Sequence, residues 1–267
     1  MMQTNPEVAE SLRQFIAVWK RIGKPFIGVD QIDRPGLAIT WPDIPFLFYN
    51  ALFLTEQLTD RETLQGRVQE AAGYMRARSN GGLFVVCLDN LHGAAEESLP
   101  AIVDQTNFVQ AMPLTGMAAD ILPMEAPGHP ALRFERVLAG SPTLQDLAQL
   151  NCVAYDLPVE TSRCIVDEPT FWREDVYGFV AYEANKPVST TTAIIHEDCL
   201  YLLLVATAPE ARRKGYGEAV LRHALHTAHA AIGIRRTVLH ATEAGYPLYL
   251  RVGYNSTAKF IGCTLKP

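Results

Sequence analysis

Apolar residues recur at helical spacing from Pro6 to Ile22, with polar residues between them. This pattern predicts an amphipathic helix that ends near Gly23. Two apolar runs of strand length follow, Leu37–Trp41 and Phe46–Leu54, and the prolines between them predict a turn. The chain is therefore expected to begin with a helix and a pair of strands.

A second helix is predicted from Thr59 towards Arg78, because Thr59, Asp60 and Glu62 are residue types that favour a helix N-terminus. The rest of this half is predicted as strand, helix and strand, at Leu83–Leu88, Ala95–Val109 and Leu114–Ile121. Three prolines and a glycine in Leu122–Pro130 are typical of a linker. We therefore expect two domains, residues 1–126 and 127–267.

The second half alternates between strand-like and helix-like patterns. Helices are expected from Ser141–Pro142 onwards, over Gly215–Ala231 and over Tyr246–Arg251. The expected strands are Leu132–Val137, Val176–Glu183, Val188–His196, Leu200–Ala206, Thr237–Thr242 and Ala258–Leu265. The short connections within the group of three strands predict antiparallel hairpins. Between the first helix and these strands, Leu157–Arg173 shows no clean periodicity and is expected to be mostly loop.

The two halves share an order of paired strands, helix, strand, helix and strand, which suggests a duplicated fold. The predicted fold class is therefore α+β: a mixed, mostly antiparallel sheet flanked by helices, with two such units in tandem.

Composition is that of a globular protein, with 48% hydrophobic and 19% charged residues. The formal net charge of -6 disfavours broad attraction to nucleic acid or to an anionic membrane. The cysteines are scattered, and neither a leader peptide nor a membrane-length apolar run is apparent. These features favour a cytoplasmic monomer or homodimer with reduced thiols.

The segment LLLVATAPEARRKGYG, residues 202–217, carries the strongest chemical signal. An apolar strand is followed by Arg212-x-x-Gly215-x-Gly217, which leads into a helix. Amides at a helix N-terminus lack intrahelical partners and lie at the positive end of the helix dipole, so they favour a pyrophosphate. The alternative is an ordinary basic loop whose glycines ease the start of the helix.

Other phosphate loops fit this turn less well. A P-loop requires Lys and Ser or Thr after its last glycine, but Glu218 follows Gly217. A dinucleotide fingerprint requires a third glycine where Val220 stands, and a tighter turn.

With its preceding strand and the later Tyr249-x-Arg251-x-Gly253-Tyr254, this motif resembles the GNAT superfamily of N-acetyltransferases over about Leu132 to Leu265. The resemblance implies acetyl-coenzyme A as cosubstrate and no metal. It places Tyr249 as the general acid that protonates the departing thiolate. It also implies a set of residues that hold the pantetheine arm and the pyrophosphate: Val205, Ala206, Thr207, Arg212, Arg213, Lys214, Gly215, Tyr216 and Gly217.

The general base is not identified by the sequence. His196, Glu197 and Asp198 precede the key strand, and Glu243 follows the next strand, so we name Glu243 as the first candidate. The histidines of the following helix, spaced three apart, lie mostly off its apolar stripe and have no acidic or thiol partner at ligand spacing, which disfavours a metal site: His223, His226 and His229.

The corresponding loop of the first half, LTEQLTDRE at residues 54–62, has no glycine. Asp60 and Glu62 at its helix start would repel a pyrophosphate. We therefore expect one coenzyme A per chain, with the first half shaping the acceptor site.

Two functions from different classes fit these features. The first is an N-acetyltransferase acting by direct attack of a primary amine in a ternary complex, without a covalent intermediate on Cys199. The alternative is a non-catalytic module that binds or senses acyl-coenzyme A. The acceptor, a small amine or an amine of a peptide or protein, is left open, although Phe171 and Trp172 are expected near it or in the core.

Overall fold

The computed structural model describes residues 5–120, 128–162, 164 and 171–266. The chain divides into two compact units. The first unit comprises Met1–Met117, Ala241–Tyr246 and Ser256–Pro267, and the second comprises Ala118–His240 and Pro247–Asn255. The boundary expected from the sequence falls among residues 121–127, which lie outside the described residues.

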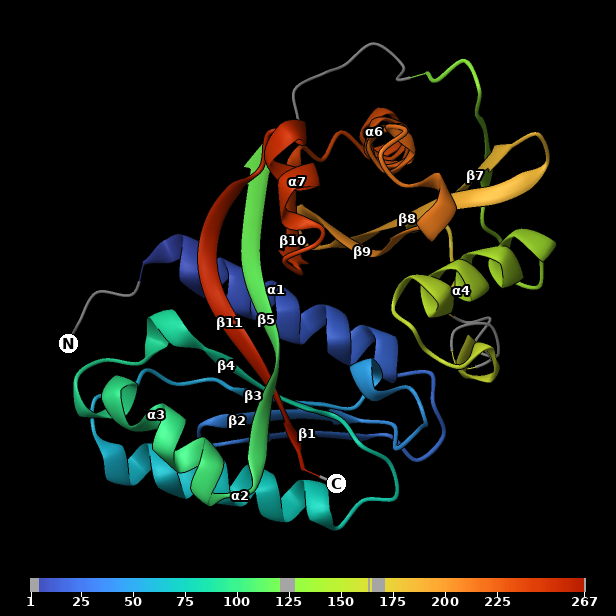
Figure 1. Ribbon diagram of the computed structural model, residues 1–267. Helices are drawn as coiled ribbons and strands as arrows, with labels where there is room; N and C mark the ends of the chain where they lie inside the picture. Colours follow the sequence, from blue (N-terminus) through green and yellow to red (C-terminus); the bar gives the residue numbers. More distant parts are fainter. Residues whose placement is uncertain (1–4, 121–127, 163, 165–170, 267) are drawn as a thin grey trace. The chain divides into compact units, whose positions relative to one another are not determined.

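The first unit is a sheet with helices on both faces (Figure 1). Its strand order is β1-β2-β3-β4-β11-β5. Helix α1 lies on one face, and α2 and α3 lie side by side on the other. The bounds are α1 Pro6–Gly23, β1 Asp30–Arg34, β2 Leu37–Trp41, β3 Ala51–Leu54, α2 Arg61–Arg76, β4 Leu83–Cys87, α3 Ala94–Gln105, β5 Phe108–Asp120 and β11 Asn255–Leu265.

The apolar core of this unit follows from the sequence pattern. The hydrophobic face of α2 and the alternate residues of β2, β3 and β4 meet in one buried cluster that includes Trp41, Leu64 and Phe84. Burial of one such large apolar side chain stabilises the fold by about 1.5–3 kcal/mol. These contacts hold the ends of β3 and β4 in place.

The second unit has the strand order β10-β9-β8-β7-β6, and α4 and α6 lie on opposite faces of its strands (Figure 1). The two hairpins expected from the short connections are confirmed, since β7 and β9 both pair antiparallel with β8. The bounds are β6 Arg133–Arg136, α4 Pro142–Ala154, β7 Val176–Glu183, β8 Lys186–His196, β9 Cys199–Thr207, α6 Tyr216–Ile232, β10 Arg236–Ala241 and α7 Tyr246–Val252.

Both units contain a parallel strand pair joined by a helix. In the first unit β3 pairs with β4 through α2, and in the second β9 pairs with β10 through α6. The remaining pairings are antiparallel where registers are defined. The predicted mixed, mostly antiparallel sheet flanked by helices, with two such units in tandem, is confirmed.

Some element predictions were wrong in detail. Of the strand expected over Phe46–Leu54, only β3 is extended, because Leu47–Tyr49 form a 3-10 helix. The buried Asn50 amide bonds Ile44 O and Gly81 O, each at 2.8 Å, and so holds this turn. The helix expected to reach Val109 ends at Gln105, because Asn107 adopts a left-handed backbone with φ 63°.

A further difference concerns the C-terminal strand. Strand β11 lies between β4 and β5 in the first unit, and it pairs antiparallel with β4 from Phe260↔Cys87 to Cys263↔Phe84. The sequence had assigned this segment to the second half.

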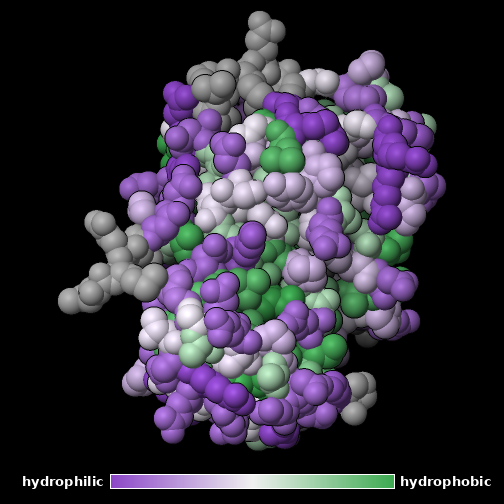
Figure 2. Space-filling model, turned by 60° about the vertical axis from the view of Figure 1, so that its left-hand side comes forward, coloured by the Kyte–Doolittle hydropathy of each residue, from purple (hydrophilic) through white to green (hydrophobic). Residues whose placement is uncertain are grey.

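The surface and the helices complete the description. On the face shown in Figure 2, hydrophilic residues cover most of the surface and hydrophobic residues show between them. No helix within the described ranges combines the length and apolar character needed to cross a membrane.

Candidate functional site

Strand β9 carries a β-bulge at the position where the sequence predicted a cofactor strand. Thr190 pairs with Ala206 and Thr192 with Leu203, so Leu204 and Val205 together oppose one residue of β8. Leu204 adopts φ 50°, a left-handed conformation that costs free energy for a branched residue. The bulge therefore turns the backbone of Leu204 and Val205 out of the regular ladder.

Buried side chains hold this bulge. Thr190 Oγ1 donates to Leu204 O at 2.8 Å. Asn151 Nδ2, from α4, lies 3.4 Å from the same oxygen and 3.1 Å from Thr190 Oγ1. Because both side chains are buried, these hydrogen bonds are shielded from water.

Strands β9 and β10 pair only over their first halves. Their parallel register runs from Cys199↔Arg236 to Leu202↔Leu239, and β9 continues beyond it to Thr207. The backbone groups of β9 after Leu202 on this side are therefore outside the β9–β10 ladder. Val205 and Thr207 are half-buried there and Ala206 is buried, so these three predicted positions lie on the strand next to the loop.

The loop that follows β9 ends at the N-terminus of α6. Arg213 and Gly215 have left-handed backbones, with φ 64° and 82°, and Gly215 occupies the N-cap position without a capping side chain. The first backbone amides of α6 have no carbonyl one turn earlier in the helix that could accept their hydrogen bonds. The predicted loop therefore leads into helix amides that have no partner within the helix, and its role in holding a pyrophosphate stays a prediction.

The three basic residues of the loop are exposed but differ in their contacts. Arg212 Nε donates to Thr207 O at 3.3 Å, which ties the loop to the end of β9. Lys214 Nζ lies 3.3 Å from Glu183, which also accepts a hydrogen bond from the Tyr216 hydroxyl. These contacts, that of Tyr216 first, lower the pKa of Glu183. Lys214 is therefore partly neutralised by this carboxylate.

Helix α7 packs against the first turn of α6. A Cβ atom at Gly217 would lie 3.0 Å from Thr207 Oγ1 and 3.6 Å from Leu248 Cδ2. Glu218 accepts from Arg222 Nε at 2.8 Å and lies 3.7 Å from Arg251 Nε. These contacts bring the helix that carries Tyr249 next to the predicted pyrophosphate loop.

Tyr249 is 7% exposed, and its ring meets that of Tyr254 edge to face with centroids 5.9 Å apart. Burial is the main cause that raises the pKa of Tyr249 far above its ordinary value. The hydroxyl is therefore protonated at neutral pH, as a proton donor requires.

The comparison with protein families agrees with this geometry. The model of the "Acetyltransferase (GNAT) family" matches residues 144–254, a range that includes the bulge, the loop and Tyr249. Residues 144–254 form a GNAT acetyltransferase domain. No curated protein matched the chain in sequence.

Solved structures resemble the whole chain, not the GNAT domain alone. A GCN5-related N-acetyltransferase from Kribbella flavida has a TM-score of 0.66 at 16% identity, with 100% of this chain and 97% of that chain covered. One from Sphaerobacter thermophilus has a TM-score of 0.60 at 14% identity, with coverage of 96% and 92%. A tandem GNAT protein from the clavulanic acid biosynthesis pathway has a TM-score of 0.58 at 11% identity, with coverage of 97% and 96%. At such identities the likeness shows a shared fold.

The sequence missed a polar pair where β9 and β10 part within the GNAT domain. The Tyr201 hydroxyl lies 2.7 Å from His240 Nδ1, and the two rings are stacked. Burial lowers the pKa of His240 to about 3, so the imidazole is neutral. In the sequence, only the position of His240 next to the apolar residues Val238 and Leu239 signals it.

The predicted base Glu243 lies in the turn after β10, and its side chain is exposed. The turn is closed by the hydrogen bond from Tyr246 N to Thr242 O at 3.0 Å. Glu243 belongs to the first unit, whereas Tyr249 and the loop belong to the second. Its role stays a prediction.

Two α6 histidines of the GNAT domain have packing partners. His223 stacks on Phe134 at 4.4 Å and meets the edge of Phe179 at 4.8 Å. His229 Nδ1 lies 3.0 Å from Ile234 O.

The two aromatic residues expected near the acceptor or in the core, Phe171 and Trp172, are buried, and the Trp172 ring packs close to Gly178. Among the described residues, no cluster of three or more His, Cys, Asp or Glu side chains is placed to hold a metal.

The corresponding helix start in the first unit is arranged differently from that of the GNAT domain. Asp60 Oδ1 accepts a hydrogen bond from Thr63 N at 2.7 Å, so a carboxylate of the chain already occupies the N-terminus of α2. The bond to Thr63 lowers the pKa of Asp60. Beyond the end of β3, Leu58 also forms an isolated parallel β-bridge with Leu91. Both features oppose a pyrophosphate there.

Proposed function

We propose that this protein transfers an acetyl group from acetyl-coenzyme A to a primary amine. The observation that carries the proposal is the bulged end of β9 leading through a glycine loop into the uncapped N-terminus of α6. This arrangement offers strand backbone for a pantetheine arm and helix amides for a pyrophosphate.

The residues of the loop divide the binding of the cosubstrate between them. Amides from Arg213 to Gly217 would hold the pyrophosphate, and Arg212 and Arg213 would add charge-assisted hydrogen bonds. The backbone of Val205, Ala206 and Thr207 would pair with the amides of the pantetheine arm.

The chemical step is acyl transfer within a ternary complex. The amine nitrogen forms a bond to the thioester carbon, and the carbon–sulfur bond breaks. Tyr249 donates its hydroxyl proton to the leaving sulfur and recovers a proton from solvent. The proton lost by the amine passes to a base, for which Glu243 is the first candidate, or to water. Backbone amides near the Leu204 bulge would donate hydrogen bonds to the thioester carbonyl oxygen as negative charge develops on it.

The acceptor class is tested by incubating the protein and acetyl-coenzyme A with small amines, amino acids and peptide amines, and by measuring release of free thiol. An acetylated product identified by mass spectrometry would establish the acceptor. Acetylated Cys199 trapped on the protein would contradict direct transfer.

The substitution Tyr249→Phe separates an enzyme from a sensor of acyl-coenzyme A. We expect kcat to fall by roughly 10²–10⁴-fold, because general acid catalysis contributes about that factor. The dissociation constant for acetyl-coenzyme A, measured by calorimetry, should change little. Tyr246→Phe on the same helix is the matched control, and its turnover should match that of the wild type. Absence of acetyl transfer to every amine tested, with intact binding of acetyl-coenzyme A, would favour the sensor.

A further inference from the structure

The last residue of β7 lies beside the predicted pyrophosphate loop. Ala184 and Asn185 have left-handed backbones, with φ 46° and 68°, and they form the two-residue turn of the β7–β8 hairpin. Glu183, directly before this turn, pairs with Lys186 in the ladder. The hairpin therefore fixes the backbone from which the Glu183 carboxylate reaches the loop.

The Glu183 carboxylate holds the residues on both sides of Gly215. Its Oε1 accepts a hydrogen bond from the Tyr216 hydroxyl, and its Oε2 lies 3.3 Å from Lys214 Nζ. Lys214 Nζ also lies 5.5 Å from the centroid of the Tyr216 ring, within the range of a cation–π contact. Tyr216 is 4% exposed, so its side chain is anchored in the core. Glu183 and Tyr216 together therefore draw the Lys214 side chain towards the end of β7.

The three cations of the loop are thus engaged to different degrees. Lys214 is held by Glu183, and Arg212 Nε donates to Thr207 O at 3.3 Å. The exposed side chain of Arg213 makes no hydrogen bond or ion pair with any residue that the structure describes. A guanidinium can bind two oxygens of a phosphate group at once. Arg213 is therefore the cation of the loop best placed to bind a diphosphate.

We propose that Glu183 is a positioning residue of the pyrophosphate loop, which withholds Lys214 from the cosubstrate and leaves Arg213 as the main phosphate-binding side chain. This inference rests on the proposed function, because it requires a diphosphate bound at the loop. An ion pair with Glu183 must be broken before Lys214 can bind the diphosphate. Glu183 therefore lowers the affinity for acetyl-coenzyme A, while its bond to Tyr216 fixes the first turn of α6.

The test is calorimetry with acetyl-coenzyme A on the full chain. Glu183→Gln keeps an oxygen that can accept from Tyr216 but loses the negative charge, so Lys214 is released. We expect this variant to bind about threefold tighter than the wild type, a factor that corresponds to an exposed ion pair. Arg213→Met should bind about tenfold weaker, because a charge-assisted contact is lost.

A double-mutant cycle assigns the gain in affinity to Lys214. Lys214→Met alone should weaken binding by less than about twofold, because this side chain is already engaged. In the Lys214→Met background, Glu183→Gln should lose most of its effect. A role of Glu183 in folding alone would not produce a gain in affinity that depends on Lys214.

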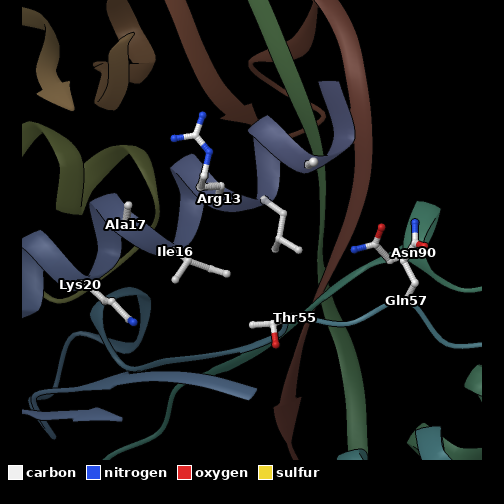
Figure 3. A pocket seen from close by; sticks show the side chains of 9 residues that line it. Arg13, Ile16, Ala17, Lys20, Thr55, Gln57 and Asn90 are labelled. Atoms are coloured by element: carbon white, nitrogen blue, oxygen red, sulfur yellow. The ribbon is translucent and has the colours of Figure 1, made fainter. Parts of the chain in front are cut away.

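The first unit provides a matched control for the change in net charge. Lys20 lines a cavity of about 610 Å³ beside α1 (Figure 3). Its Nζ bonds both carboxylate oxygens of Asp33, at 2.5 and 2.7 Å. Asp33→Asn removes a carboxylate from a lysine as Glu183→Gln does, but outside residues 144–254 of the GNAT domain. Its affinity for acetyl-coenzyme A should equal that of the wild type.

A second measurement needs no ligand. The hydrogen bond from Tyr216 and the contact with Lys214 lower the pKa of Glu183. Lys214→Met should therefore raise the pKa of Glu183, which NMR titration of the carboxylate measures.

The proposal is overturned if the wild type binds acetyl-coenzyme A but Glu183→Gln binds no tighter. It is also overturned if the gain is equally large in the Lys214→Met background, or if Lys214→Met leaves the pKa of Glu183 unchanged. Absence of acetyl-coenzyme A binding by the wild type would contradict the proposed function, and this inference with it.

Discussion

A glycine is required at position 217 because a side chain there would have little space, and not because of its backbone conformation. A Cβ atom would meet Thr207 Oγ1 at 3.0 Å, at the junction of β9 and the pyrophosphate loop. We expect Gly217→Val to weaken acetyl-coenzyme A binding at least about tenfold, since larger groups displace either the strand end or the ligand. Calorimetry measures this change.

The control for this substitution is Gly73→Val in α2, where an added Cβ has no atom within 4 Å. Its acetyl-coenzyme A affinity should equal that of the wild type. Unchanged binding in Gly217→Val would show that the loop holds no pyrophosphate.

Sequence and structure contribute differently at the residue scale. The glycines and basic residues of the loop were predicted from their spacing before a helix, whereas Tyr249 was predicted from the resemblance of its segment to the GNAT family, and these roles stay predictions. Leu204 and His240 could not be identified in this way. Leucine in a strand carries no sign of a left-handed φ, and the pairing of His240 with Tyr201 joins two strands that are distant in sequence.

Among the elements, the bulge of β9 depends on buried hydrogen bonds from its neighbours. Thr190→Val is nearly isosteric and removes the bond to Leu204 O, 2.8 Å long in the native protein. We expect a loss of about 1–2 kcal/mol in the free energy of unfolding, together with weaker acetyl-coenzyme A binding. Urea unfolding and calorimetry report the two effects.

Thr227→Val provides the comparison, because the Thr227 hydroxyl donates a hydrogen bond within its own helix, to His223 O at 2.8 Å. Its effect on unfolding should stay within about 0.5 kcal/mol, and binding should be retained. Equal effects of the two substitutions would argue against a special role for the bulge.

The N-terminus of α2 predicts a pH-dependent contribution to stability. The bond from Thr63 N lowers the folded-state pKa of Asp60 below its unfolded value. The stabilisation is therefore present above the unfolded pKa and is lost as pH falls through the folded pKa. Asp60→Asn keeps a cap but removes the charge.

The stability difference between wild type and Asp60→Asn should thus favour the wild type at neutral pH and shrink as the pH falls below the ordinary pKa of an aspartate, about 3.9. Chemical unfolding of both proteins across this range measures it. A difference that stays constant with pH would contradict the assigned role of the carboxylate.

At the scale of the whole molecule, the duplicated order of elements was visible in the sequence. A strand, a helix and a second strand recur as β3-α2-β4 and β9-α6-β10. Periodicity detects such local units because each element must bury one face. Periodicity placed β11 in the second half, because the apolar pattern of a segment does not encode which strand that segment pairs with.

The sequence by itself determined the helix and strand periodicities, the glycine loop before α6 and the acidic helix start at Asp60, because these depend on neighbouring residues. The tertiary structure decided the insertion of β11 between β4 and β5, the bulge held by Asn151 and Thr190, and the cavity beside α1. Each of these requires residues far apart in the chain to meet. The physical reason is that local backbone preferences act over a few residues, whereas packing and buried hydrogen bonds select among the arrangements that those preferences allow.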